Sequence, residues 1–141
     1  MVNFFNMNIT KYFIPLLILI SFACSSCEKF SGGNGDSITG AWRCREESGN
    51  NFRQYSVSID RAGGRYDSTY FIIYNFHNLG FDFETYAQLK DSTLRVIFTD
   101  GLYSVSGKGM VSKNLKIINW SYSVSGQNVN DNYVTAYYYK Q

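Results

Sequence analysis

Three ionisable side chains near the middle of the sequence could perform hydrolytic chemistry. His77 is the single histidine, and Asp82 and Glu84 follow it on one face of a predicted strand. Residues two apart on a strand lie about 7 Å apart, a separation at which paired carboxylates can act on a glycosidic bond. No zinc-ligand or Ser-His-acid spacing accompanies them in the sequence. We therefore expect a solvated histidine in a turn, no metal, no cofactor and no enzymatic activity, and a hydrolase is only the third functional hypothesis.

Aromatic side chains offer a second kind of chemistry, which is binding by stacking. The chain has 12 Tyr, 11 Phe and 2 Trp, and Tyr133, Tyr137 and Tyr139 share one face of the last predicted strand. Exposed tyrosines stack on sugar rings or anchor protein partners, because they offer a large contact area at low entropic cost. Tyrosine is also common on solvated sheet faces, where cross-strand stacking accounts for it. We predict that these three residues bind a ligand, with a scaffold role as the alternative.

Two cysteines near the N-terminus, Cys24 and Cys27, could carry a lipid. A short, weakly basic start and a 12-residue apolar segment at 12–23 precede them, as in a secretory signal peptide. This run is shorter than the roughly 20 residues that a membrane-spanning helix needs. The small residues before Cys27 resemble the lipobox of bacterial lipoproteins, in which cleavage precedes a cysteine that receives a diacylglyceryl group. We predict Cys27 as the lipid attachment residue, with Cys24 as the alternative.

The third cysteine, Cys44, lies two residues after Trp42 on the same face of a predicted strand. Cleavage before Cys27 leaves Cys44 as the one thiol able to pair, whereas cleavage before Cys24 leaves Cys27 and Cys44 free to form a disulfide. No histidine stands near Cys44 in the sequence to activate a thiolate. We expect Cys44 to be a small, buried, apolar side chain.

Strands must position all of these residues. From residue 38 onward, apolar and polar residues alternate in runs separated by turn residues, the pattern of half-buried strands. Eight such runs and no helix are predicted, at 38–47, 52–60, 67–76, 81–89, 94–98, 102–111, 115–124 and 133–140. A meander of eight strands has two exposed edges unless it closes on itself. We therefore predict an all-β fold, an eight-stranded antiparallel up-and-down barrel, with a membrane-embedded barrel as the rival architecture.

The same alternation predicts details of the barrel. Its interior should receive several large side chains, namely Trp42, Tyr55, Phe83, Phe98 and Trp120. A slip in the alternation between Ile117 and Ile118 predicts a bulge. Gly107 and Gly109, on one face of their strand, predict a bend or the close approach of another segment. Residues 126–132 are predicted to be a polar loop.

Length and charge limit the organisation and the partners. The 141 residues divide into a lipoprotein signal peptide at 1–26, an acylated cysteine with a flexible, Gly-rich tether at 27–37, and one barrel domain at 38–141. The formal net charge is +2 and forms no basic stripe along the sequence, so nucleic acid is not an expected partner.

The segment Ile38-Thr39-Gly40-Ala41-Trp42 resembles the Gly-x-Trp opening of lipocalins and of the lipocalin-like domains of small Bacteroidetes lipoproteins. Residues 73–80, 105–109 and 135–141 are also similar to recurrent segments of one group of these lipoproteins. The group is mostly uncharacterised, so the resemblance implies a barrel and a lipid anchor without implying an activity. Lipocalins place an arginine against the tryptophan, and Lys140 is the residue available here for that position.

Together these features predict a lipoprotein of the bacterial cell envelope. The lipid would anchor it to the outer membrane, either facing the periplasm or exposed at the surface, because two or more acyl chains give stable membrane binding. The expected role is non-catalytic binding or accessory function, with a glycan, a small apolar ligand or an envelope protein as partner. A purely structural subunit of an envelope complex is the alternative.

Overall fold

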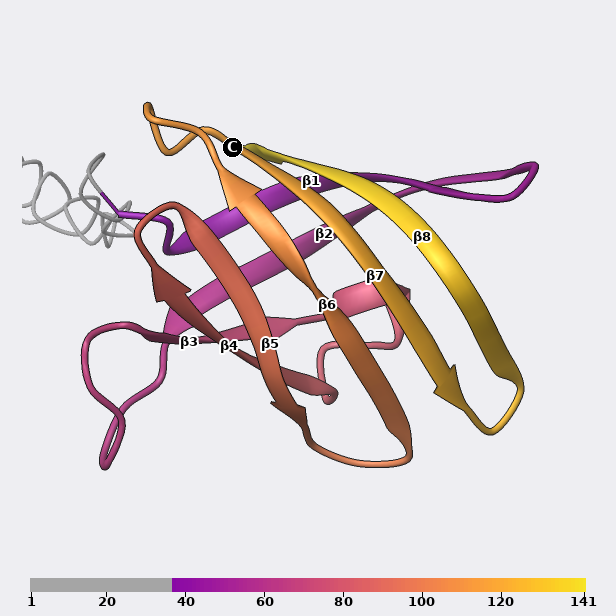
Figure 1. Ribbon diagram of the computed structural model, residues 1–141, viewed down its shortest axis with the longest axis horizontal. Coiled ribbons are helices and arrows are strands. Elements are labelled where there is room, and N and C mark those ends of the chain that lie inside the picture. The colour runs from indigo at the N-terminus through magenta and orange to yellow at the C-terminus, as the bar shows by residue number, and fades with distance from the viewer. Residues whose placement is uncertain (1–36) are drawn as a thin grey trace, which may run out of the picture. The chain divides into compact units, whose positions relative to one another are not determined.

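The computed structural model describes residues 37–141, which form a closed antiparallel barrel (Figure 1). Its eight strands are β1 (Gly40–Ser48), β2 (Asn51–Arg61), β3 (Tyr70–Tyr74), β4 (Glu84–Lys90), β5 (Thr93–Thr99), β6 (Tyr103–Val111), β7 (Ile117–Gly126) and β8 (Val129–Lys140). Each strand pairs with the next along the chain, and β8 pairs with β1. The predicted fold class, an all-β up-and-down barrel of eight strands, is confirmed.

The predicted signal peptide at 1–26, both candidate lipid-attachment cysteines and all of the tether except Ser37 lie outside the described residues. Among residues 37–141, the structure has no helix with the length and apolar character of a membrane span.

The strands run between two ends of the barrel, which differ in their chemistry. One end gathers the β1–β2, β3–β4, β5–β6 and β7–β8 connections, and we call it the network end. The opposite end gathers residue 37, the β2–β3, β4–β5 and β6–β7 connections and residue 141, and we call it the tether end.

Large aromatic side chains fill the barrel, as the alternation predicts. Trp42, Trp120 and Tyr138 point inward and are at most 1% exposed. Phe76 packs against Trp120 edge to face, with ring centroids 5.1 Å apart, a favourable geometry for aromatic pairs. Burial of this much apolar surface is the main driving force that holds the barrel closed.

Gly107 and Gly109 of β6 make room for these rings. In the β6–β7 register, Gly107 lies opposite Tyr122 and Gly109 lies opposite Trp120. A Cβ atom at Gly109 would come within 2.7 Å of the Trp120 ring, and one at Gly107 would collide with Tyr122. The predicted close approach of another segment is confirmed.

A short 3-10 turn, η1 (Phe76–Asn78), closes the network end from within. Sequence reasoning predicts no helix and extends the third strand to Phe76, but the strand ends at Tyr74. Asn75 has φ 61° and His77 has φ 55°, so the chain leaves the extended conformation there. The Asn75 side chain stabilises the turn, donating to the Ser56 carbonyl (2.7 Å) and accepting from the Gly80 N–H (2.9 Å). The turn directs Phe76 and His77 into the barrel.

Two bulges also differ from prediction. The β4–β5 register shifts beyond Ala87–Val96, which turns Phe98 outward, where it stacks on Tyr86 with centroids 4.1 Å apart. The prediction that Phe98 fills the interior is therefore wrong. The bulge predicted at Ile117 and Ile118 is also wrong, because β7 simply begins at Ile117. The actual irregularity lies on β8 opposite Ser123, where two successive residues are exposed.

Two strand boundaries also differ from prediction. β4 begins at Glu84 rather than at residue 81, and Phe81 is 57% exposed in the preceding connection. β8 begins at Val129, so residues 126–132 form a tight β7–β8 turn and the start of β8 instead of a polar loop.

The tether end is closed by Trp42 and its neighbours. The Trp42 indole N–H donates to the Ile38 carbonyl at 2.9 Å. The Lys140 ammonium lies 5.9 Å from the centre of the Trp42 ring. Lys140 also donates to the Ser37 carbonyl, which fixes the first described residue against the last strand.

Candidate functional site

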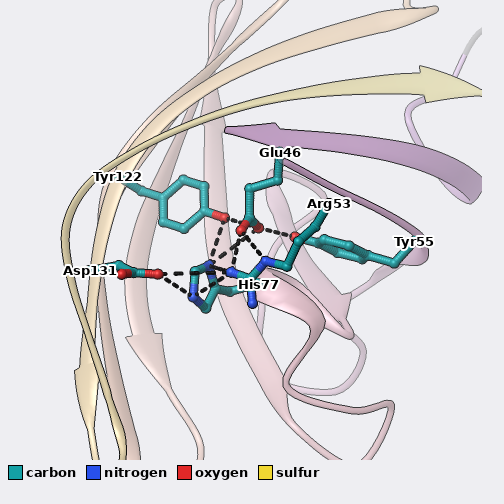
Figure 2. Close-up of polar contacts among 6 residues, drawn as sticks. All are labelled: Glu46, Arg53, Tyr55, His77, Tyr122 and Asp131. Atoms are coloured by element: carbon teal, nitrogen blue, oxygen red, sulfur yellow. Dashed lines mark hydrogen bonds and ion pairs between the residues drawn. The ribbon is translucent and has the colours of Figure 1, made fainter. Parts of the chain in front are cut away.

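A buried carboxylate, Glu46, is the centre of a polar network at the network end (Figure 2). Glu46 is 1% exposed and points inward from β1, two and four positions after Cys44 and Trp42. Its Oε1 accepts from the Arg53 Nε at 3.0 Å and from Arg53 Nη2. Its Oε2 accepts from the Tyr122 hydroxyl at 2.7 Å and from the Tyr55 hydroxyl.

Strand register brings these partners to Glu46. Arg53 lies directly opposite Glu46 in the β1–β2 pair, and Tyr55 follows two residues later on the same inward face. Tyr122 reaches the same point from β7 across the interior. Burial opposes ionisation of Glu46, but hydrogen bonds from His77, Tyr55 and Tyr122 outweigh it and lower the pKa of the carboxyl group to about 2. Glu46 is therefore an ionised acceptor at neutral pH.

His77 lies between two carboxylates. Its Nδ1 is 3.2 Å from Glu46 Oε2 and its Nε2 is 3.1 Å from Asp131 Oδ2. The Arg53 Nη2 also lies 3.0 Å from His77 Nε2, and the Tyr122 hydroxyl lies 3.1 Å from His77 Nδ1, so the ring joins both carboxylates to the arginine and the tyrosine. His77 is 1% exposed, and the prediction of a solvated turn histidine is wrong because η1 folds into the barrel.

Asp131 reaches the network because of the bulge in β8. The two exposed residues that follow it, Asn132 and Tyr133, interrupt the alternation and leave Asp131 facing the barrel mouth. Its carboxylate lies 3.8 Å from Arg53 as well as beside His77. The Arg53 and Asp131 side chains are 40% and 34% exposed, so together they connect the buried network to solvent.

A shallow pocket of about 250 Å³ opens directly above this charged pair. It forms because β8 pairs with β1 only as far as Thr135, so the β1–β2 hairpin and the start of β8 separate (Figure 1). The residues that line it are Ser48, Asn51, Phe52, Arg53 and Asp131. Phe52 is 52% exposed, and the guanidinium carbon of Arg45 lies over its ring, 4.8 Å from the ring centre. The pocket thus combines N–H donors, a carboxylate acceptor and an aromatic edge.

The network residues are poor candidates for a nucleophile or a general base. Both oxygens of Glu46 already accept hydrogen bonds from protein groups. Burial raises the pKa values of Tyr55 and Tyr122, which keeps both hydroxyls neutral donors. Burial also raises the pKa of the free Cys44 thiol to about 12. Cys44 is fully buried, which confirms the prediction of a small buried side chain.

The three predicted tyrosines lie apart from this network. Tyr133, Tyr137 and Tyr139 all face outward on β8, and Tyr133 and Tyr139 are 73% and 43% exposed. Six residues of strand separate Tyr133 from Tyr139, which is about 20 Å. The three therefore share a face without forming one compact cluster, and their role in binding stays a prediction.

The predicted carboxylate pair does not join His77. Asp82 is exposed in the β3–β4 connection, and Glu84 accepts from the Tyr86 hydroxyl at 2.6 Å on the outer face of β4. The carboxylates that contact His77 are Glu46 and Asp131 instead. Sequence reasoning missed Glu46, although its position in the inward series of β1 was a usable signal.

Residues 37–141 contain no group of three or more His, Cys, Asp or Glu side chains positioned to hold a metal ion. The chain matches no family model, no curated protein and no solved structure. The inference of function therefore depends on the site itself.

Proposed function

We propose that this protein is a lipid-anchored, non-catalytic binding protein of the bacterial envelope, and that its barrel binds a glycan at the pocket above Arg53 and Asp131. The observation that supports this function most strongly is the composition of that pocket: an arginine, a carboxylate, an amide and an exposed aromatic ring around a small space. These groups match the hydroxyls and the apolar face of a sugar.

The size of the pocket and the filled barrel favour a small polar ligand over an apolar one. A volume of about 250 Å³ lies below the range of roughly 300–1,000 Å³ typical of drug-sized ligands. Trp42, Trp120 and Tyr138 occupy the interior, where lipocalins hold apolar cargo. A single sugar unit at the pocket, with the rest of a glycan extending into solvent, is the ligand that this geometry suits best.

The buried network contributes by holding Arg53 and Asp131 in place before the ligand arrives. Arg53 is fixed by Glu46, and Asp131 is fixed by His77. Groups that are already ordered lose less conformational entropy on binding, which increases affinity. This preorganisation supports a binding role better than a catalytic one, because Glu46 has no free lone-pair position facing the pocket.

The lipid anchor is the second part of the proposal, and the sequence supports it. The small residues before Cys27 and the preceding apolar run are the supporting features. Metabolic labelling with a fatty-acid analogue is expected to mark the full chain and to fail for Cys27→Ser. Labelling that persists in Cys27→Ser and is lost in Cys24→Ser would move the attachment to Cys24.

Glycan binding is tested with a soluble fragment, residues 32–141, on an array of bacterial and host glycans. Asp131→Asn is expected to weaken the strongest binding by about tenfold, since it removes one charge-assisted hydrogen bond. Asp82→Asn, which changes an exposed carboxylate away from the pocket lining, is the matched control and should bind as wild type does. Phe52→Ala should weaken binding by severalfold, because the aromatic edge is lost.

Two results would contradict the proposed site. Binding that is unchanged by Asp131→Asn and Phe52→Ala but lost in Tyr137→Ala or Tyr139→Ala would move the site to the tyrosine face of β8. No saturable glycan binding, together with an envelope protein that co-purifies with the chain, would favour the structural-subunit hypothesis.

A further inference from the structure

The two ends of the barrel have opposite side-chain charge. Arg45 and Arg53 lie at the network end together with six carboxylates, which gives a net charge of −4 there. Eight Lys and Arg lie at the tether end with three Asp, which gives +5. The basic residues of the tether end are Arg61, Arg65, Lys90, Arg95, Lys108, Lys113, Lys116 and Lys140. Arg43, midway along β1, accounts for the remaining charge.

The positive charges at the tether end are not neutralised within the barrel. Every ion pair formed among residues 37–141 lies at the network end. Five of the basic side chains gather on adjacent segments, β4 to β6 and the β6–β7 connection, and we call them the basic patch: Lys90, Arg95, Lys108, Lys113 and Lys116. The β4–β5 and β6–β7 connections are adjacent, since the Val111 N–H donates to the Ser92 carbonyl at 2.7 Å.

Two residues of the basic patch face each other across paired strands. Arg95 of β5 lies directly opposite Lys108 of β6, and both side chains are exposed. Like charges directly opposite each other on paired strands destabilise a sheet. A bound anion between the two side chains would offset this repulsion. A hollow of about 260 Å³ lies beside Arg95, and its lining residues are Gln88, Lys90, Asp91, Thr93 and Arg95. Asp91 is the single carboxylate there.

We propose that the basic patch docks on the anionic headgroups of the membrane that holds the anchor, with a lipid phosphate between Arg95 and Lys108. This inference rests on the proposed lipid anchor and adds the orientation of the barrel. Residue 37 leaves the barrel at the tether end, so the ten residues from Cys27 span at most about 35 Å. The sequence predicts a Gly-rich tether here, and chains of that composition and length have a typical end-to-end distance of about 17 Å, which would keep the patch near the surface. The network end and its pocket then face away from the membrane.

The test uses the soluble fragment, residues 32–141, so that the lipid anchor plays no part in the result. All strand pairs of the barrel lie within residues 40–140, so this fragment keeps the whole barrel. Vesicles of phosphatidylcholine alone are compared with vesicles that also contain phosphatidylglycerol, and bound protein is measured by co-sedimentation. Binding is expected only to the anionic vesicles, and it should be abolished near 1 M salt, where the screening length is about 3 Å.

Two double variants with the same loss of charge separate the patch from a general effect of net charge. Arg95→Gln with Lys108→Gln is expected to weaken binding to the anionic vesicles by about 25-fold, or about fivefold for each basic side chain near a membrane surface. Arg43→Gln with Arg45→Gln removes two exposed charges from β1 and should change binding by less than about threefold. Thermal unfolding of both variants verifies that each is folded.

Equal losses in the two double variants, or no binding of the wild-type fragment to anionic vesicles, would overturn the proposal. Saturable binding of inorganic phosphate that depends on Arg95 and Lys108, without any vesicle binding, would also overturn it by making the patch a site for a soluble anion. The lipid-labelling and glycan experiments are independent of these results, so failure of the patch is distinguishable from failure of the anchor or of the pocket.

Discussion

The two ends of the barrel place similar charged residues in opposite environments. At the network end, Glu46 and His77 are buried, and each lies within hydrogen-bond or ion-pair distance of an oppositely charged or polar side chain. At the tether end, Arg95 and Lys108 are exposed and form no ion pair within the described residues. Charged side chains that face the interior are held by other side chains of the barrel and help to fix its structure. Charged side chains that face outward remain free to contact another molecule.

The same difference determines how much each end contributes to stability. Removing one partner of a buried ion pair leaves an uncompensated charge and costs about 3–5 kcal/mol. Exposed charges without partners contribute little to the free energy of unfolding. Substitutions in the buried network should therefore lower the free energy of unfolding. Substitutions in the basic patch should instead weaken binding to the membrane.

The largest effect is expected for Glu46→Gln. Loss of this carboxylate removes the buried acceptor that Arg53 and His77 share, and we expect a decrease of about 3 kcal/mol in the free energy of unfolding. Glu47→Gln changes the next residue, an exposed side chain paired with Arg45, and should cost less than about 1 kcal/mol. Urea denaturation of wild type and both variants measures the two changes in the free energy of unfolding. Equal destabilisation would show that burial of Glu46 does not distinguish it from its neighbour.

The pH dependence of stability should follow from the same carboxylate. The pKa of Glu46 is lowered from 4.5 to about 2 in the folded protein, so the unfolded chain binds a proton first as the pH falls. The contribution of Glu46 is therefore fully present above about pH 5 and is lost between about pH 5 and pH 2, with a total of about 3 kcal/mol. Urea denaturation at several pH values in this range should show that the difference in the free energy of unfolding between wild type and Glu46→Gln decreases as the pH falls. A constant difference would contradict the lowered pKa.

A smaller effect is expected for Gly107→Ala. The added Cβ would collide with Tyr122 and with the Ser121 carbonyl, moving the hydroxyl that donates to Glu46. We expect a loss of about 1–3 kcal/mol, typical of overpacking in a core. Gly63→Ala is the control, since a Cβ there would meet nothing within 4 Å, and its thermal midpoint should stay near that of wild type or rise slightly. A tolerated Gly107→Ala would mean that Tyr122 is not closely fixed.

The smallest effect is expected at the tether end, for Lys140→Gln. This change removes the ammonium from the face of Trp42 and its hydrogen bond to Ser37, which should cost about 0.5–1 kcal/mol. Lys116→Gln removes an exposed lysine without such contacts and should change the free energy of unfolding by less than about 0.5 kcal/mol. If Lys140→Gln lowered the free energy of unfolding as much as Glu46→Gln does, the tether end would be as sensitive to substitution as the network end.

The sequence predicts the fold well because strand signals are local. Alternation in β1 and β2 and glycine or asparagine at the turns depend on residues close in the chain, and they predict eight strands and closure. The inward positions of Trp42, Tyr55 and Trp120 follow from the same period of two. Glu46 continues the inward series of β1, so its burial could also have been predicted.

The rest of the site depends on contacts between distant segments. Asp131 faces the mouth only because β8 bulges after it, and nothing in the local pattern marks that position. His77 is buried because Glu46 and Asp131, 31 and 54 residues away in the sequence, supply its two acceptors. Phe98 turns outward because a bulge on β5 shifts the register. Such irregularities arise from closing a twisted sheet and are not encoded in the hydrophobic period.

The most direct test of the division between the two ends is a fluorescence-quenching measurement on the full chain, with its proposed lipid anchor, in anionic vesicles. A fluorophore is attached at Ser92→Cys, in the β4–β5 connection, or at Asn50→Cys, in the β1–β2 turn, and both positions are exposed. The fully buried Cys44, whose pKa is raised to about 12, should remain unlabelled.

With a quencher attached to lipid headgroups, we expect strong quenching of the label at residue 92 and little at residue 50. The quenching at residue 92 should decrease when Arg95 and Lys108 are replaced by Gln. Equal quenching at the two positions, or stronger quenching at residue 50, would contradict an arrangement in which the tether end faces the membrane and the network end faces the ligand.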